Sequence, residues 1–154
     1  MIADIPLPTT DNPIDAPFWR AALRGELVVQ ACADCGAARH PPRAMCPTCQ
    51  SMQVRWLNAG GRGRIWSFAI PQAPLLPAFA ALTPYVTAVV ELDDFPGLRL
   101  VGPMVDRASG EIAQIDPSPF AIGAAVEVRF VSFAEDVALA CWRLCDHSPS
   151  AVES

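Results

Sequence analysis

Residues 32–49 read CADCGAARHPPRAMCPTC and hold two C-x2-C pairs, Cys32 with Cys35 and Cys46 with Cys49. Two residues between paired cysteines allow a tight turn that directs both sulfurs toward one metal ion, about 2.3 Å away in the case of zinc. Two such turns complete a tetrahedron of four thiolates. In a reducing compartment, where disulfides are rare, this spacing indicates a metal site.

A site closed by four thiolates has no open position for a substrate or a catalytic water, so we expect the metal to be structural. Its binding should stabilise a ribbon over residues 26–57, which carries little apolar core of its own. We expect one zinc ion per chain, with iron as the alternative because both turns also resemble the rubredoxin pattern. His40, between the pairs, is expected to be an ordinary loop residue.

The segment before the ribbon predicts a short helix. Asp15 is a suitable N-cap, Pro17 falls in the first turn, and Gly25 is a suitable end. Phe18 and Trp19 are large side chains for so short a helix, which would not be stable alone. The helix must therefore pack on its own domain or on a partner.

Five segments between residues 62 and 146 alternate apolar and polar side chains, which predicts an antiparallel sheet with one buried face. Such strands fit a small closed OB-fold barrel, with the Pro-containing stretch over residues 115–123 as a plug and Cys141 in the core. The predicted fold is mainly β: an N-terminal tail and helix over residues 1–25, a rubredoxin-like zinc ribbon over 26–57, a five-stranded OB-fold barrel over 58–146, and a flexible tail over 147–154.

Residues 71–84, PQAPLLPAFAALTP, form a connection that we call the apolar loop. Loops of this length are usually functional or disordered, and disordered segments are usually polar. This loop instead carries Leu75, Leu76, Phe79 and Leu82. It must bury these side chains against its own barrel, a partner or an acyl ligand.

Composition limits the classes of function. All 11 basic residues are arginines, and 16 acidic residues give a formal charge of −5, which argues against binding to nucleic-acid backbones. No apolar run approaches the roughly 20 residues of a membrane span, and the N-terminal residues lack the pattern of a secretory signal. We therefore expect a soluble cytoplasmic protein. No nucleophile–base pattern or phosphate-binding glycine loop is evident, so no catalytic residue is assigned.

Five stretches, in this order, resemble the DUF35 family of zinc-ribbon and OB-fold proteins, over about residues 15–145. They are FWRAALRGELVVQACADCG (18–36), HPPRAMCPTC (40–49), GRGRIWSFAI (61–70), PYVTAVVELDD (84–94) and IGAAVEVRF (122–130). The resemblance implies a small non-catalytic subunit that assembles with a thiolase-like enzyme into a hetero-oligomer. Such complexes carry out acyl transfer, or retro-aldol cleavage of steroid and other acyl-CoA side chains.

Two sets of residues are candidates for this role. The expected partner interface comprises Phe18, Trp19, Leu75, Leu76, Phe79, Leu82 and Tyr85. The candidate coenzyme A contacts are Arg43, Arg62, Arg64 and Trp66, since arginine forks suit phosphates and an indole can stack on adenine. The alternatives are solvated arginines, and Trp56 and Trp66 at a seam between ribbon and barrel.

Two other functions stay open. Zinc ribbons and OB barrels both occur in nucleic-acid-binding modules, although the absence of lysine and the negative charge oppose this interpretation. A rubredoxin-like electron carrier would require iron at the four cysteines, and its visible colour would reveal it.

Overall fold

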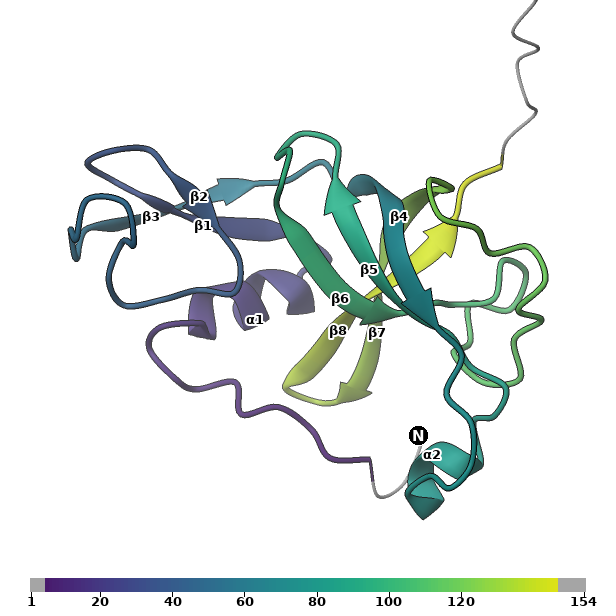
Figure 1. Ribbon diagram of the computed structural model, residues 1–154. Helices are drawn as coiled ribbons and strands as arrows, with labels where there is room; N and C mark the ends of the chain where they lie inside the picture. Colours follow the sequence, from purple (N-terminus) through teal and green to yellow (C-terminus); the bar gives the residue numbers. More distant parts are fainter. Residues whose placement is uncertain (1–4, 147–154) are drawn as a thin grey trace, which may run out of the picture.

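The computed structural model describes residues 5–146 and has two antiparallel sheets with one N-terminal helix beside them (Figure 1). The expected flexible tail over 147–154 lies outside the described residues. The smaller sheet is the ribbon and the larger is the OB-fold barrel, so the predicted fold class is confirmed. Within the described residues, none of the helices has the length and apolar character needed to cross a membrane.

Helix α1 (Ala16–Leu23) starts and ends close to the predicted positions. A proline stands in its first turn, and Gly25 follows the helix with a φ of +76°, a conformation that glycine adopts without steric cost. The helix buries Phe18 and packs against β1 and β8. One detail differs from the prediction, because the Asp15 side chain makes no capping hydrogen bond.

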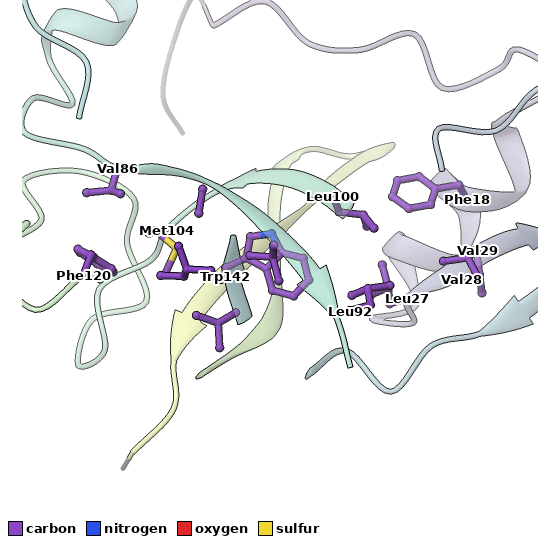
Figure 2. Close-up of a cluster of buried hydrophobic side chains, with 14 of the residues drawn as sticks. Phe18, Leu27, Val28, Val29, Val86, Leu92, Leu100, Met104, Phe120 and Trp142 are labelled. Atoms are coloured by element: carbon purple, nitrogen blue, oxygen red, sulfur yellow. The ribbon is translucent and has the colours of Figure 1, made fainter. Parts of the chain in front are cut away.

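The ribbon sheet has the strand order β2-β1-β3, formed by β2 (Ala38–Arg39), β1 (Val28–Cys32) and β3 (Val54–Asn58). Strand β1 is buried at every position. Val28 and Val29, with Leu27 before them, share one hydrophobic cluster with Leu92 and Leu100 of the barrel (Figure 2). Ribbon and barrel are therefore joined by a common core.

The larger sheet has the order β6-β5-β4-β7-β8. Its strands are β4 (Arg62–Ala69), β5 (Thr87–Leu92), β6 (Arg99–Pro103), β7 (Ala125–Ala134) and β8 (Val137–Leu144). A parallel bridge between Met104 and Trp142 joins the two edges, and the Val105 N–H donates to the Trp142 carbonyl at 2.8 Å. This contact closes the sheet into the barrel expected of an OB fold.

The barrel core follows the predicted alternation in β5 and β6, whereas β7 and β8 do not alternate strictly. Strand β5 alternates buried and half-buried residues, and Trp142 is fully buried at the centre of the cluster (Figure 2). The coil between β6 and β7 inserts Ile115 and Phe120 into the same cluster, so the predicted plug is present without a helix. Cys141 is buried, as predicted.

Strand β4 departs from strict alternation because its pairing with β5 shifts between Ile65 and Ser67. Trp66 is 51% exposed on the outer surface, where the Arg99 guanidinium stacks 3.9 Å from the ring centroid. The prediction of a seam position is therefore wrong for Trp66. It holds for Trp56, which packs half-buried against the core that ribbon and barrel share.

The apolar loop is partly folded back onto the barrel and contains a one-turn helix, α2 (Pro77–Ala80). Leu82 is only 4% exposed because it packs with Val105, Ile112 and Cys141 in a second hydrophobic cluster. The prediction that Leu82 contacts a partner is wrong, because its side chain belongs to the core of this chain. Leu76, by contrast, is the N-cap of α2 and is 62% exposed. Helix α2 lies at the end of the molecule remote from the ribbon (Figure 1).

Candidate functional site

The four paired cysteines converge on one point of the ribbon, where their Sγ atoms all lie within 4.8 Å of one another. The Sγ atoms of Cys32 and Cys49 are 3.6 Å apart, as are those of Cys35 and Cys46. Four thiolates about 2.3 Å from one zinc ion would be separated by about 3.8 Å in a regular tetrahedron. The clustering of the four Sγ atoms therefore suits a tetrahedral metal ion.

Backbone N–H groups favour the thiolate form at two of the four positions, Cys32 and Cys46. Cys32 closes β1 and Cys35 follows in the turn, where its N–H lies 3.5 Å from the Cys32 Sγ. This N–H, with smaller contributions, lowers the pKa of Cys32 to about 6. The Cys49 N–H is the main cause of a lowered pKa at Cys46. Both effects favour the thiolate, which is the form that binds metal. At Cys49 the Ser51 N–H lowers the pKa, but the neighbouring Cys35 and Cys32 thiols outweigh it and raise the pKa to about 12.

The remaining metal-ligating side chains lie outside this centre. Burial raises the pKa of Cys141 to about 12, so this thiol stays protonated inside the second cluster. Cys145 follows the last strand and lines a different hollow. His40 is not part of the cysteine cluster, in agreement with its expected role as a loop residue. Within residues 5–146, the four ribbon cysteines form the one group arranged to hold an ion.

A hollow of about 310 Å³, which we call the arginine hollow, lies along β4 and β7. Arg62 and Arg64, two of the four predicted coenzyme A contacts, line it. Its other charged residues are Asp93, Glu127 and Asp146. The other two predicted contacts lie elsewhere: Arg43 donates its N–H to Gln30 in the ribbon at 2.9 Å, and Trp66 is covered by Arg99.

Glu127 is already paired within the arginine hollow. Its Oε1 accepts hydrogen bonds from Arg143 at 2.5 Å and from Arg129 at 2.7 Å. These arginines, Arg143 first, hold the pKa of Glu127 below its usual value. Within the described residues, Arg62 and Arg64 form no ion pair. Arg64 donates a hydrogen bond to the Gly123 carbonyl at 3.2 Å, and the charge of Arg62 adds to the effect of Arg143 and Arg129 on the pKa of Glu127.

A second hollow, which we call the α1 hollow, has a volume of about 230 Å³ and lies between α1, the loop at residues 40–42, β6 and β8. Phe18 and Trp19 of the predicted partner interface line it, together with Asp15 and His40. Sequence reasoning missed this site. Its residues come from separate segments, and no spacing in the sequence signals that they meet.

Comparison with known proteins places the chain in a family. Residues 19–55 match a family model described as "ChsH2, rubredoxin-like zinc ribbon domain", and residues 56–131 match "ChsH2, C-terminal OB-fold domain". A "DUF35 domain-containing scaffold protein" of Methanothermobacter thermautotrophicus is 32% identical over 120 residues, which are 77% of this chain and 82% of the relative. The chain belongs to the DUF35 family. The resemblance inferred from the sequence is thereby confirmed.

Two further relatives are longer proteins. A "Probable enoyl-CoA hydratase alpha subunit" of Thermomonospora curvata is 41% identical over 99 residues, 64% of this chain and 30% of the relative. A "3-oxo-4,17-pregnadiene-20-carboxyl-CoA hydratase alpha subunit" of Mycobacterium tuberculosis is 33% identical over 125 residues, 81% of this chain and 36% of the relative. The chain thus spans about a third of the length of these two proteins.

Solved structures of DUF35 proteins share the fold. A chain of the "Ltp2-ChsH2(DUF35) aldolase" superposes with a TM-score of 0.75 and 32% identity, covering 89% of this chain and 98% of that one. A DUF35 protein of unknown function from Sulfolobus solfataricus has a TM-score of 0.55 at 13% identity, covering 87% of each chain. The second likeness supports the fold alone.

Proposed function

We propose that this chain is a non-catalytic accessory subunit of a thiolase-like acyl-CoA enzyme in acyl-CoA or steroid side-chain metabolism. The observation that carries the proposal is the match, at 32% identity, to 98% of a chain of the "Ltp2-ChsH2(DUF35) aldolase". The carbon–carbon chemistry would belong to the partner subunit, and the present chain would support assembly and acyl-CoA binding.

The metal supports a structural role. We infer that the four cysteines hold one zinc ion per chain, because the knuckle turns and their sulfur spacing suit a closed tetrahedral site. When bound, the ion would link β1 to the loop that follows β2. Four thiolates leave no coordination position for a substrate, so the metal would take no part in a reaction. Iron would give visible absorption, and a colourless protein would exclude it.

Two regions would contact the acyl-CoA enzyme and its substrate. The exposed part of the apolar loop, with Leu76 at its tip and Leu75 half-buried beside it, is the proposed docking surface for the thiolase-like subunit. Leaving a leucine of this exposure in water instead of burying it costs about 1.5–3 kcal/mol. Arg62 and Arg64 are the proposed ligands for coenzyme A phosphates, since both line the arginine hollow and neither forms an ion pair within the described residues.

The test is affinity purification of the tagged chain from its native host, followed by identification of the associated protein. We expect a thiolase-like subunit, and we expect the purified complex, but not the isolated chain, to turn over acyl-CoA substrates. Turnover by the isolated chain that is lost on a point change in its own residues would contradict a non-catalytic role.

A matched pair of variants locates the interface. Leu76→Asp should weaken binding to the partner by roughly tenfold to a hundredfold, which corresponds to the free energy of burying one leucine. Ile122→Asp is the control, because Ile122 is 73% exposed in a loop before β7 and outside the apolar loop. Equal affinities for Leu76→Asp and the unmodified chain would place the interface elsewhere.

A further inference from the structure

Residues 5–12 precede α1 as an extended segment without helix or strand, which we call the N-terminal strap. The strap runs from the region of α1 toward α2 (Figure 1). Ile5 is half-buried and packs against the second hydrophobic cluster, whose buried members are Leu82, Val105, Ile112 and Cys141. The strap therefore connects α1 with the cluster into which the apolar loop inserts Leu82.

The strap is held to the barrel mainly by one apolar side chain. Ile5 is the one strap residue in a hydrophobic cluster, whereas Leu7 is 42% exposed and belongs to neither cluster. Pro8 and Thr10 are half-buried. Within the described residues, positions 5–11 neither donate nor accept a hydrogen bond. Segments with few buried contacts and an unbonded backbone open at a low free-energy cost, so the strap can leave the barrel without unfolding it.

The same cluster carries the inner part of the proposed docking surface. The Phe79 N–H donates to the Leu76 carbonyl at 2.9 Å, which places these two residues one turn apart along α2. The Phe79 ring lies 6.1 Å from the Tyr85 ring, and both side chains pack half-buried against the second cluster. Leu76, Phe79 and Tyr85 therefore form a continuous set of apolar side chains, which we call the apolar stripe.

Ile5 and the apolar stripe share the margin of one cluster. A partner that docks on Leu76 alone buries one side chain, whereas a partner that covers the whole stripe also buries two aromatic rings, which are enriched at protein interfaces. Full burial of the stripe requires the margin to which Ile5 contributes. Pro6 and Pro8 restrict the released strap, so closing it costs less conformational entropy than closing a segment of ordinary residues.

We propose that the N-terminal strap is an autoinhibitory contact. Ile5 covers the margin of the second cluster in the free chain, and the partner subunit displaces it when it docks on the apolar stripe. This inference rests on the docking surface proposed above, whereas the single anchor of the strap follows from the structure alone. If the strap is closed in about nine of ten molecules, the partner binds about tenfold more weakly than to an open chain, because apparent affinity scales with the competent fraction.

The first test uses the chain alone. Tyr85 is the one tyrosine of the sequence, so incorporation of meta-fluorotyrosine gives a single fluorine NMR signal that reports on the apolar stripe. Ile5→Ser removes the anchor and should increase the broadening of this signal by a dissolved nitroxide about twofold or more. Leu7→Ser is the matched control, because Leu7 belongs to the same strap but lies outside the cluster. Equal broadening in Ile5→Ser and the unmodified chain would overturn the covering role of Ile5.

The second test measures the affinity of the same variants for the partner subunit captured from the native host. Ile5→Ser should bind this subunit roughly threefold to tenfold more tightly than the unmodified chain, and Leu7→Ser should bind it equally well. Circular dichroism and metal content establish that both variants are folded. Weaker binding by Ile5→Ser would make the strap part of the interface, and equal binding would mean that the strap does not compete. Either result overturns the proposal.

The two proposals fail separately. If purification from the native host yields no thiolase-like subunit, the accessory role is contradicted, whereas the fluorine measurement still decides whether Ile5 covers the stripe. If that subunit is captured and Leu76→Asp weakens its binding, but Ile5→Ser does not strengthen it, the docking surface stands and the autoinhibitory strap is contradicted.

Discussion

The local environment gives cysteines of this chain different pKa values. Cys32 lies at a turn whose backbone N–H groups lower its pKa to about 6, whereas Cys141 lies in an apolar cluster that raises its pKa to about 12. The first is prepared to lose its proton to a metal, and the second acts as a small hydrophobic side chain. Their roles can be distinguished by substitution.

Cys46→Ser is expected to abolish stoichiometric metal binding, because it removes one of four ligands and opens the site. Cys141→Ser should keep the metal and lose only a modest amount of stability from a buried hydroxyl. Elemental analysis of both purified variants measures the metal. Equal metal loss from the two substitutions would contradict the assigned ligand set.

At the scale of elements, closure of the barrel depends on a close approach between β6 and β8. Gly102 of β6 lies directly over β8, and a Cβ built there would be 2.5 Å from the Ala140 carbonyl oxygen and 3.0 Å from Trp142 Nε1. Any side chain at this position would push the strands apart near the bridge between Met104 and Trp142. Glycine is therefore a requirement of the closure.

Gly102→Ala should destabilise the protein by about 1–3 kcal/mol through this overpacking, as measured by chemical denaturation. Gly60→Ala is the matched control, because a Cβ there would meet only the Asp94 carboxylate at an ordinary distance of 3.5 Å. A Gly102 variant as stable as the control would mean that the barrel is not closed tightly at this point.

At the scale of the whole molecule, ribbon and barrel depend on one another. Leu27, Val28 and Val29 of the ribbon side lie in the same cluster as Leu92 and Leu100 of the barrel (Figure 2). Helix α1 packs against both β1 and β8. A metal ion held by the four cysteines would therefore anchor a ribbon whose central strand also forms part of the barrel core.

Removal of the metal by a chelator should lower the melting temperature of the entire chain. Each kcal/mol of lost stability corresponds to roughly 2–4 °C for a chain of this size. Far-ultraviolet circular dichroism, which reports the sheets, and tryptophan fluorescence, dominated by buried and half-buried indoles, should shift together. Two separate transitions, with an unchanged barrel, would show that the shared core does not couple them.

The sequence alone predicted the cluster of four cysteines, the order of ribbon and barrel, and the buried face of strands such as β5. These features depend on short-range patterns: the spacing of the cysteines between 32 and 49, and the period of two in segments such as β5. A tight turn and a pleated strand impose such patterns locally, so they can be read without knowing the partners of each strand.

Tertiary structure decided what depends on contacts between distant segments. The register of β4 against β5 placed Trp66 outside under Arg99, and the folding back of the apolar loop buried Leu82 but left Leu76 exposed. Docking of α1 and the ribbon loop on the barrel brought Asp15 and His40 to one hollow. Local patterns carry no signal for these outcomes, because each is set by packing between segments separated along the chain.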